Sequence, residues 1–195
     1  MNELLARLIA DLLALHARHA MVGGHAVSAR TEPRFTRDLD LAVAVEDDHE
    51  AEALIRAMVA RGYRPVALLE QDETGRLATV RLEHQSSPGM IVDLLFATAG
   101  IEPEGVAAAT PLQVLAKLSL PVASVGHLLA LKTLSIDDDR PHDRADLVAL
   151  LRAATAEDIA EAELALRLIG ERRCSRGRDL PTIFARLRAE LGPCR

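Results

Sequence analysis

The sequence predicts an α+β fold, in which a mixed sheet flanked by helices is followed by a C-terminal helical region. Residues 1–122 switch repeatedly between strand and helix periodicity, whereas residues 123–195 show almost only helical periodicity. Hydrophobic residues make up 49% of the 195 residues and aromatic residues only 2%, so the core must be mostly aliphatic. We therefore predict a core domain at 1–122 and a helical region at 123–195 that packs on it.

The N-terminal elements follow from periodicity and from helix-ending residues. Polar residues recur every four positions in residues 2–18, which is typical of an amphipathic helix with one polar stripe. The pair Asp47-Asp48 can cap a later helix, and Gly62 can end it. In chain order we expect a helix at 2–18, a strand at 20–22, a helix at 24–30, a strand at 37–45 and a helix from 47 to 62.

The remaining elements are separated by turn residues. Strand patterns at 64–69 and 76–84 flank the turn Asp72-Glu73-Thr74-Gly75, and a turn at Ser87-Pro88-Gly89 precedes an apolar strand at 90–97. A Pro- and Gly-containing connector at 100–111 and one further extended piece follow. From residue 124 we expect helices to the end, with breaks around 137–142, 155–157 and 171–180.

Composition excludes several classes of protein. The net charge of −6 argues against a generally basic nucleic-acid-binding surface. Cys174 and Cys194 suggest neither a disulfide framework nor a zinc site. The Leu-rich N-terminus lacks a basic segment and a cleavage site, and no apolar run is long enough to span a bilayer. We expect a cytoplasmic protein without membrane contact.

Two aspartates on one strand are the most unusual local feature. Leu39, Leu41 and Val43 alternate with Asp38 and Asp40, so both carboxylates lie on one face, about 6–7 Å apart. Asp is depleted in strands, and two like charges at this spacing repel each other. An exposed edge strand would tolerate them, and a bound cation would give them a function.

A glycine pair before this strand and a third aspartate after it favour the cation site over the exposed edge strand. Gly23-Gly24 opens a helix, where backbone N–H groups can approach phosphate oxygens. Asp93 is the one charged residue in the apolar strand at 90–97. Separately, the glycine pair could be an ordinary turn and Asp93 a hydrogen-bonded core residue. In this order, all three are typical of a site for a nucleoside triphosphate and Mg²⁺.

The pattern resembles the polymerase-β-like nucleotidyltransferase superfamily, whose motif is a glycine pair, a spacer and Asp-hydrophobic-Asp, with a later third carboxylate. The resemblance implies that Gly23 and Gly24 bind the nucleotide phosphates. It also implies that Asp38, Asp40 and Asp93 are catalytic and hold Mg²⁺, or Mn²⁺ in its place, in a two-metal site. The expected fold is the mixed sheet of this superfamily.

A second block of residues is similar to the abortive-infection (AbiE-type) nucleotidyltransferase toxins. The helix HLLALKTL after PVAS, and then Arg140 with Asp143, Asp146 and Leu147, match the pattern of that family. By this resemblance Lys132 is catalytic and binds the triphosphate, and Asp146 belongs to the nucleotide site. From the residues alone, Lys132 could instead extend its amine into water, and Asp143 could cap a helix.

The resemblance implies an enzyme that transfers NMP from an NTP to a hydroxyl of tRNA or of a protein and releases pyrophosphate. A toxin–antitoxin role in phage defence implies a cognate antitoxin as partner. One alternative is an aminoglycoside-type enzyme that modifies a small molecule. The other is a non-catalytic relative that binds a nucleotide or a partner protein, although the three intact carboxylates argue against it.

Two groups of arginines are candidates for phosphate contacts. Arg30, Arg34 and Arg37 lie close in sequence to the aspartate pair, and we assign Arg37 to the nucleotide site. The segment ERRCSRGRDL at 171–180 contains four more arginines. These could contact RNA phosphates or an acidic partner, but such a charge run is also typical of a solvated loop.

Overall fold

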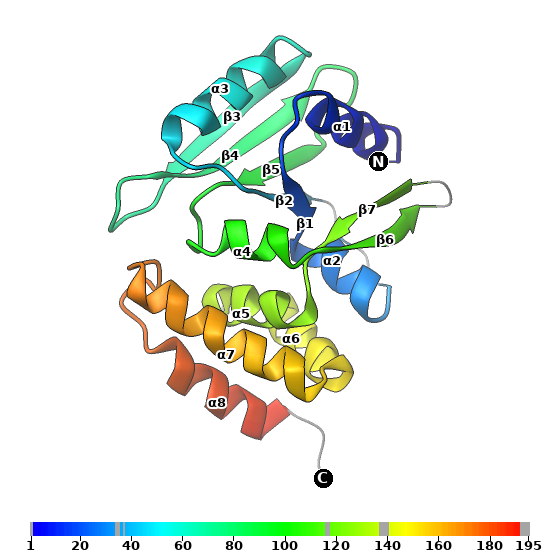
Figure 1. The fold of residues 1–195 in the computed structure, drawn as a ribbon. Helices are drawn as coiled ribbons and strands as arrows, with labels where there is room; N and C mark the ends of the chain where they lie inside the picture. The colour runs from blue at the N-terminus through cyan, green and yellow to red at the C-terminus, as the bar shows by residue number, and fades with distance from the viewer. Residues whose placement is uncertain (1, 34–35, 37, 116–117, 137–140, 192–195) are drawn as a thin grey trace.

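The computed structural model describes residues 2–33, 36, 38–115, 118–136 and 141–191. A seven-stranded mixed sheet with the strand order β3-β4-β5-β2-β1-β7-β6 forms its centre (Figure 1). Two neighbouring pairs, β2 with β5 and β1 with β7, are parallel, and the other neighbours are antiparallel. This is the α+β class with a mixed sheet that the sequence predicts.

The strands are β1 (His19–Met21), β2 (Leu39–Val43), β3 (Tyr63–Glu70), β4 (Leu77–His84), β5 (Ile91–Leu95), β6 (Thr110–Leu115) and β7 (Leu118–Val122). The helices are α1 (Asn2–Ala14), α2 (Gly23–Arg30), α3 (Asp48–Val59), α4 (Glu102–Ala107), α5 (Val125–Ser135), α6 (Pro141–Ala153), α7 (Ala156–Glu171) and α8 (Leu180–Leu191). No helix in the described part of the chain is long and apolar enough to cross a membrane.

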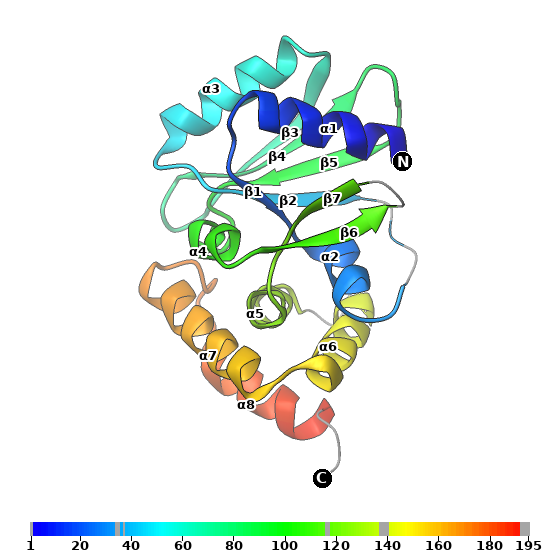
Figure 2. The same cartoon turned by 45° about the vertical axis from the view of Figure 1, so that its right-hand side comes forward.

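The helices form layers on both faces of the sheet. Figure 2 shows α1 and α3 on one face, and α2, α4 and α5 on the other. The last helices pack around α5, which contacts α6, α7 and α8 (Figure 2). Helix α5 therefore lies between the sheet and the C-terminal helices, and it also contacts α2.

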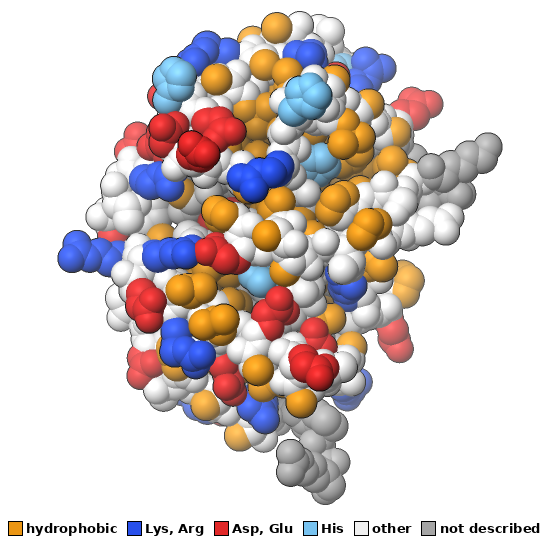
Figure 3. Space-filling view, in the orientation of Figure 1, with side chains coloured by type: hydrophobic (Ala, Val, Ile, Leu, Met, Phe, Trp, Pro, Cys, Tyr) orange, Lys and Arg blue, Asp and Glu red, His pale blue; other side chains and the backbone are white. Residues whose placement is uncertain are grey.

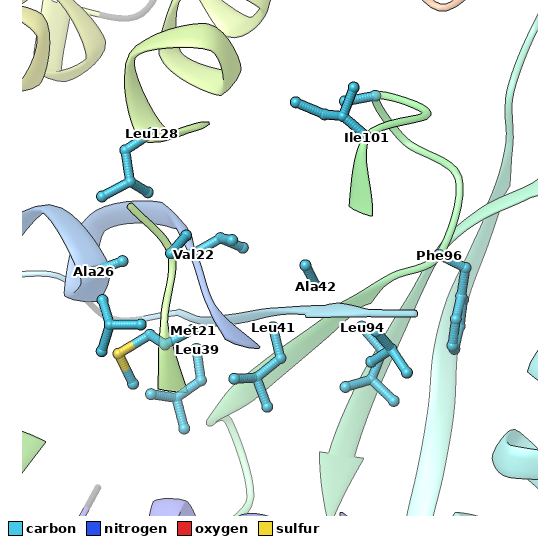
Figure 4. Packing of buried hydrophobic residues seen from close by; sticks show 14 of the residues in the cluster. Met21, Val22, Ala26, Leu39, Leu41, Ala42, Leu94, Phe96, Ile101 and Leu128 are labelled. Atoms are coloured by element: carbon cyan, nitrogen blue, oxygen red, sulfur yellow. The ribbon is translucent and has the colours of Figure 1, made fainter. Parts of the chain in front are cut away.

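The period of two in β2 directs its side chains to opposite layers. Leu39 and Leu41 are 1% and 0% exposed and point away from α5, whereas Ala42 points toward it (Figure 4). Leu94 of β5 lies on the same side as Leu41, its register partner. Because Asp40 shares the face of Ala42, the core-forming leucines fix this aspartate on the α5 side of the sheet.

The observed elements differ from the predicted ones in three places. The first helix ends at Ala14 rather than near residue 18, because the backbone turns into the left-handed region at His16, where φ is +54°. The predicted connector at 100–111 contains the short helix α4 and the start of β6. Strand β2 covers 39–43 rather than 37–45, so Asp38 lies just before the strand. The domain boundary near residue 122 stays a prediction.

Candidate active site

Strand register brings two of the predicted carboxylates side by side. In the parallel pairing of β2 with β5, Asp40 is the register partner of Asp93. In the antiparallel pairing of β5 with β4, Asp93 is the partner of Arg81. Since directly paired residues point to the same face of a sheet, Asp40, Asp93 and Arg81 form one row across three adjacent strands.

Arg81 forms a two-pronged ion pair with Asp93. Its Nε donates to Oδ1 at 2.9 Å and its terminal nitrogen donates to Oδ2 at 2.7 Å. The hydrogen bonds to Asp93 raise the pKa of Arg81, so the guanidinium stays charged. An ionised carboxylate has about four acceptor positions, and Arg81 uses two of them. The side of Asp93 that Arg81 does not occupy remains available to a ligand.

Arg81 is a site residue that the local sequence pattern does not single out. The alternation of Thr79, Arg81 and Glu83 with apolar residues in β4 places Arg81 on the polar face of its strand. The alternation does not show which residue of the neighbouring strand lies beside Arg81, because the pairing with Asp93 depends on the β4–β5 register. A prediction of the β4–β5 register would have identified Arg81, because it would have placed this cation beside the candidate carboxylate of Asp93.

The surroundings of Asp40 disfavour its charged form. Burial raises its pKa to about 7, and the nearby carboxylates of Asp93 and Asp38 contribute to the rise, against the opposing effects of Lys132 and Arg81. Asp38 itself is exposed at the start of β2. A half-buried carboxylate between two others is a favourable position for a cation, which would restore the charge balance.

Gly23 leaves space for the carboxylate of Asp40. Its φ is +64°, and a Cβ at this position would lie 2.0 Å from Oδ2 of Asp40. Residue 23 must therefore be glycine for both conformational and steric reasons. Helix α2 begins here, and Val22 at its N-cap provides no side-chain hydrogen bond. Gly23 and Gly24 line the same pocket as Asp40, so a helix N-terminus, which favours anions, opens next to this carboxylate.

Lys132 is buried and paired rather than extended into water. Its Nζ lies 2.5 Å from Oδ1 of Asp143 and 2.8 Å from Oδ2 of Asp146, and its side chain is 12% exposed. Both aspartates are buried in α6. The ion pairs join α5 to α6 and fix the ammonium group, so the interpretation of Lys132 as a surface lysine is wrong.

A pocket of about 240 Å³ connects these groups. It is lined by Gly23, Gly24, Asp40, Lys132 and Asp143. Asp93 adjoins this pocket through Asp40, and Asp146 adjoins it through Lys132. The structure thus brings together the predicted glycines, three of the predicted carboxylates and the lysine, which come from the sheet, α2, α5 and α6.

The arginines near the aspartate pair contribute less than expected. Arg37 and Arg34 lie outside the described residues. Arg30 donates hydrogen bonds to the carbonyls of Ala123 and Val122, at 2.9 and 2.7 Å, and to Thr110. It therefore joins α2 to β6 and β7 and is not directed at the pocket.

The carboxylates fit a divalent cation in their chemistry. Burial and the neighbouring carboxylates raise the pKa of Asp40 although Lys132 and Arg81 oppose the rise, and carboxylate oxygens are preferred Mg²⁺ ligands. Within the part of the chain that the structure describes, no three His, Cys, Asp or Glu side chains are already arranged as a metal cage. Asp93 is held by Arg81 in this arrangement.

Comparison with solved structures shows that the chain has the fold of nucleotidyltransferase-like proteins. An antigenic nucleotidyltransferase-like protein from Paracoccidioides brasiliensis matches with a TM-score of 0.54 at 16% identity, covering 98% of this chain and 93% of that chain. The lincomycin-bound lincosamide antibiotic adenylyltransferase LnuA matches with a TM-score of 0.52 at 15% identity, covering 79% of this chain and 98% of that one. At these identities the likeness shows the fold alone.

The family follows from the sequence itself. A family model described as "Nucleotidyl transferase AbiEii toxin, Type IV TA system" matches residues 3–191, and the chain belongs to this family. No curated protein matches the chain significantly. Membership identifies an NTP-dependent nucleotidyltransferase of the toxin type and implies an antitoxin as partner.

Proposed function

We propose that the chain transfers NMP from an NTP to a hydroxyl of tRNA or of a protein, in an Mg²⁺-dependent reaction, as the toxin of a toxin–antitoxin pair. The observation that supports this most strongly is the position of Asp40 beside the N-terminus of α2, in the pocket that Lys132 lines. A carboxylate that a cation would stabilise and a helix N-terminus that favours phosphate lie together there.

In this proposal Asp38, Asp40 and Asp93 would hold Mg²⁺, or Mn²⁺ in its place. When bound, the metal would neutralise the charge that develops on the phosphates. The N–H groups at Gly23 and Gly24 and the ammonium group of Lys132 would orient the triphosphate, with Asp146 and Asp143 fixing the lysine. Arg37, which lies outside the described residues, would add a phosphate contact.

The transfer forms a bond from the acceptor oxygen to the α-phosphorus and breaks the bond from that phosphorus to the bridging oxygen. Pyrophosphate leaves with that oxygen. Arg81 fixes the orientation of Asp93, and this carboxylate would accept the proton that the acceptor hydroxyl loses. Most of the rate enhancement would come from positioning and from electrostatic stabilisation.

An RNA acceptor would be bound locally rather than through a basic face. Acidic and basic side chains are interspersed on the face shown in Figure 3. The net charge of −6 agrees with this picture. We therefore expect the acceptor to be recognised close to the pocket, with a weaker salt dependence than a broad basic surface would give.

The test is to incubate the protein with each α-labelled NTP, Mg²⁺ and either purified total tRNA or RNase-treated lysate. We expect label in one of these fractions with one preferred NTP, and none with Asp40→Asn. Label in neither fraction with any of the four NTPs would refute the proposal. Label that appears only on an added aminoglycoside would favour the small-molecule alternative.

A further inference from the structure

The loop between α7 and α8 lies next to the active-site pocket. It leaves α7 after Glu171 and enters α8 at Leu180, and it passes beside α4 in both views (Figures 1 and 2). Arg172, at its start, forms a two-pronged ion pair with Glu104 of α4, with N–O distances of 2.6 and 3.0 Å. Its guanidinium also donates to the carbonyl of Gly100.

Further contacts hold the rest of the loop. Cys174 is buried, and its Sγ packs so closely on Gly100 that a Cβ there would lie 2.9 Å away. The side-chain amide of Gln71 donates to the carbonyl of Arg173 at 3.0 Å. Arg178 donates to the carbonyls of Ile136 and Thr133, at 3.0 and 3.3 Å, and thereby caps the end of α5. The loop is thus fixed on both sides of residue 176.

Arg176 lines the same pocket as Gly23, Asp40 and Lys132. It has a φ of +56° and is exposed. Its anchored neighbours therefore determine where its side chain begins, and the α7–α8 loop brings this residue to the pocket. None of the hydrogen bonds and ion pairs within the described residues involves the Arg176 side chain.

The two cations that line the pocket differ in how their charge is balanced. The ammonium group of Lys132 lies within 3 Å of two carboxylates, so its charge is already compensated. The guanidinium of Arg176 has no such partner in the described part of the chain. An incoming polyanion would therefore gain more from Arg176 than from Lys132, because Lys132 must share its hydrogen bonds with Asp143 and Asp146.

We infer that Arg176 binds the triphosphate of the NTP at the end of the pocket away from the α2 N-terminus. A guanidinium can bind two phosphate oxygens at once, and it stays charged at every working pH. In this arrangement Lys132 and its two aspartates position the site, and Arg176 provides the net positive charge. The inference rests on the proposed function and assigns one of its ligand contacts to a residue of the α7–α8 loop.

The test compares Arg176→Gln with Arg173→Gln. Arg173 lies three residues away in the same loop, is exposed and has a φ of +59°, but it does not line the pocket. Both variants lose one charge and keep the same backbone conformation. We expect Arg176→Gln to raise the Kd of the preferred NTP, measured by calorimetry with Mg²⁺, by roughly 10- to 100-fold. Arg173→Gln should change it less than about twofold.

The size of the phosphate chain provides a second comparison. The Kd of the matching NMP should change much less in Arg176→Gln, because the β- and γ-phosphates are absent. Arg176→Lys should give an intermediate loss, since it keeps the charge but not the two-pronged geometry. Melting temperatures of all three variants close to that of the wild type would show that the loop is intact.

The outcomes separate the inference from the proposed function. If the wild type binds no NTP, the proposed function fails and the inference fails with it. If the wild type binds an NTP and Arg176→Gln binds it equally well, only the inference is overturned. Equal losses for NTP and NMP, equal losses in the two Gln variants, or a rise confined to the KM of the acceptor would also overturn it.

Discussion

The charge on Asp40 predicts that its replacement by Asn makes the metal-free protein more stable while abolishing transfer. Asn has the same shape, so it fits beneath Gly23, where a larger group would clash. The substitution removes a carboxylate whose pKa burial and neighbouring carboxylates raise to about 7. Lys132 and Arg81 offset that charge only in part, so the metal-free protein should gain stability from its loss.

The sign and size of the effect follow from the two pKa values. In the unfolded chain Asp40 titrates near 3.8, and in the native state near 7. Between these values the native state holds a proton that the unfolded chain has lost, so the free energy of unfolding falls as pH rises, and it levels off above 7. A difference of roughly three pKa units corresponds to about 4 kcal/mol, which is the upper limit of the gain at pH 8.

The assay is urea unfolding of chelator-treated protein at several pH values from 5 to 8, followed by circular dichroism. We expect the wild type to lose stability over this range and Asp40→Asn to lose much less. Asp38→Asn is the matched control, since Asp38 is exposed and its removal should change little. An unchanged pH slope in Asp40→Asn would refute the reasoning about its charge. So would near-normal transfer activity in that variant.

Three further substitutions test the other parts of the site. Lys132→Met should destabilise the protein by about 3–5 kcal/mol in urea unfolding, because two buried carboxylates lose their partner. Adding Asp146→Asn should restore part of the lost stability. A stable single variant would contradict the buried pairing. Gly23→Ala should lose more stability than Gly75→Ala, since both have a positive φ and cost about 1–2 kcal/mol on that account, but only Gly23 faces a carboxylate; equal losses would remove the steric argument. Mg²⁺ with the preferred NTP at a hundredfold excess over its Kd should stabilise the wild type by about 2.7 kcal/mol, seen as a rise of several degrees in Tm. Asp93→Asn should keep much of this rise and lose turnover, and a full loss of the rise would assign Asp93 to nucleotide binding instead.

Local sequence patterns were sufficient to predict the fold class and the glycine and aspartate residues of the site. The alternation around Asp40 depends only on neighbouring residues, and so does the need for glycine at the start of α2. The order of glycine pair, paired aspartates and later Asp93 is a motif that identifies the nucleotidyltransferase superfamily without any structure. The end of the first helix was predicted four residues too late, because periodicity does not reveal the left-handed backbone at His16.

Contacts between distant segments were decided by the tertiary structure alone. The partner of Asp93 is Arg81 because of the β4–β5 register, which turn and strand patterns do not specify. The charge of Lys132 is balanced by α6 because α5 and α6 pack together. Burial and nearby charges, both set by packing, raise the pKa of Asp40.

The segment 171–180 shows most clearly what the sequence determines and what the tertiary structure decides. By itself the sequence determined that this segment is a break between helices with four arginines, which is equally typical of a solvated loop. Folding gives the arginines different surroundings: Arg172 and Arg178 anchor the loop, and Arg176 lines the pocket. The physical reason is that charge patterns fix which groups are present, whereas long-range packing fixes which of them are already paired and which remain available to a ligand.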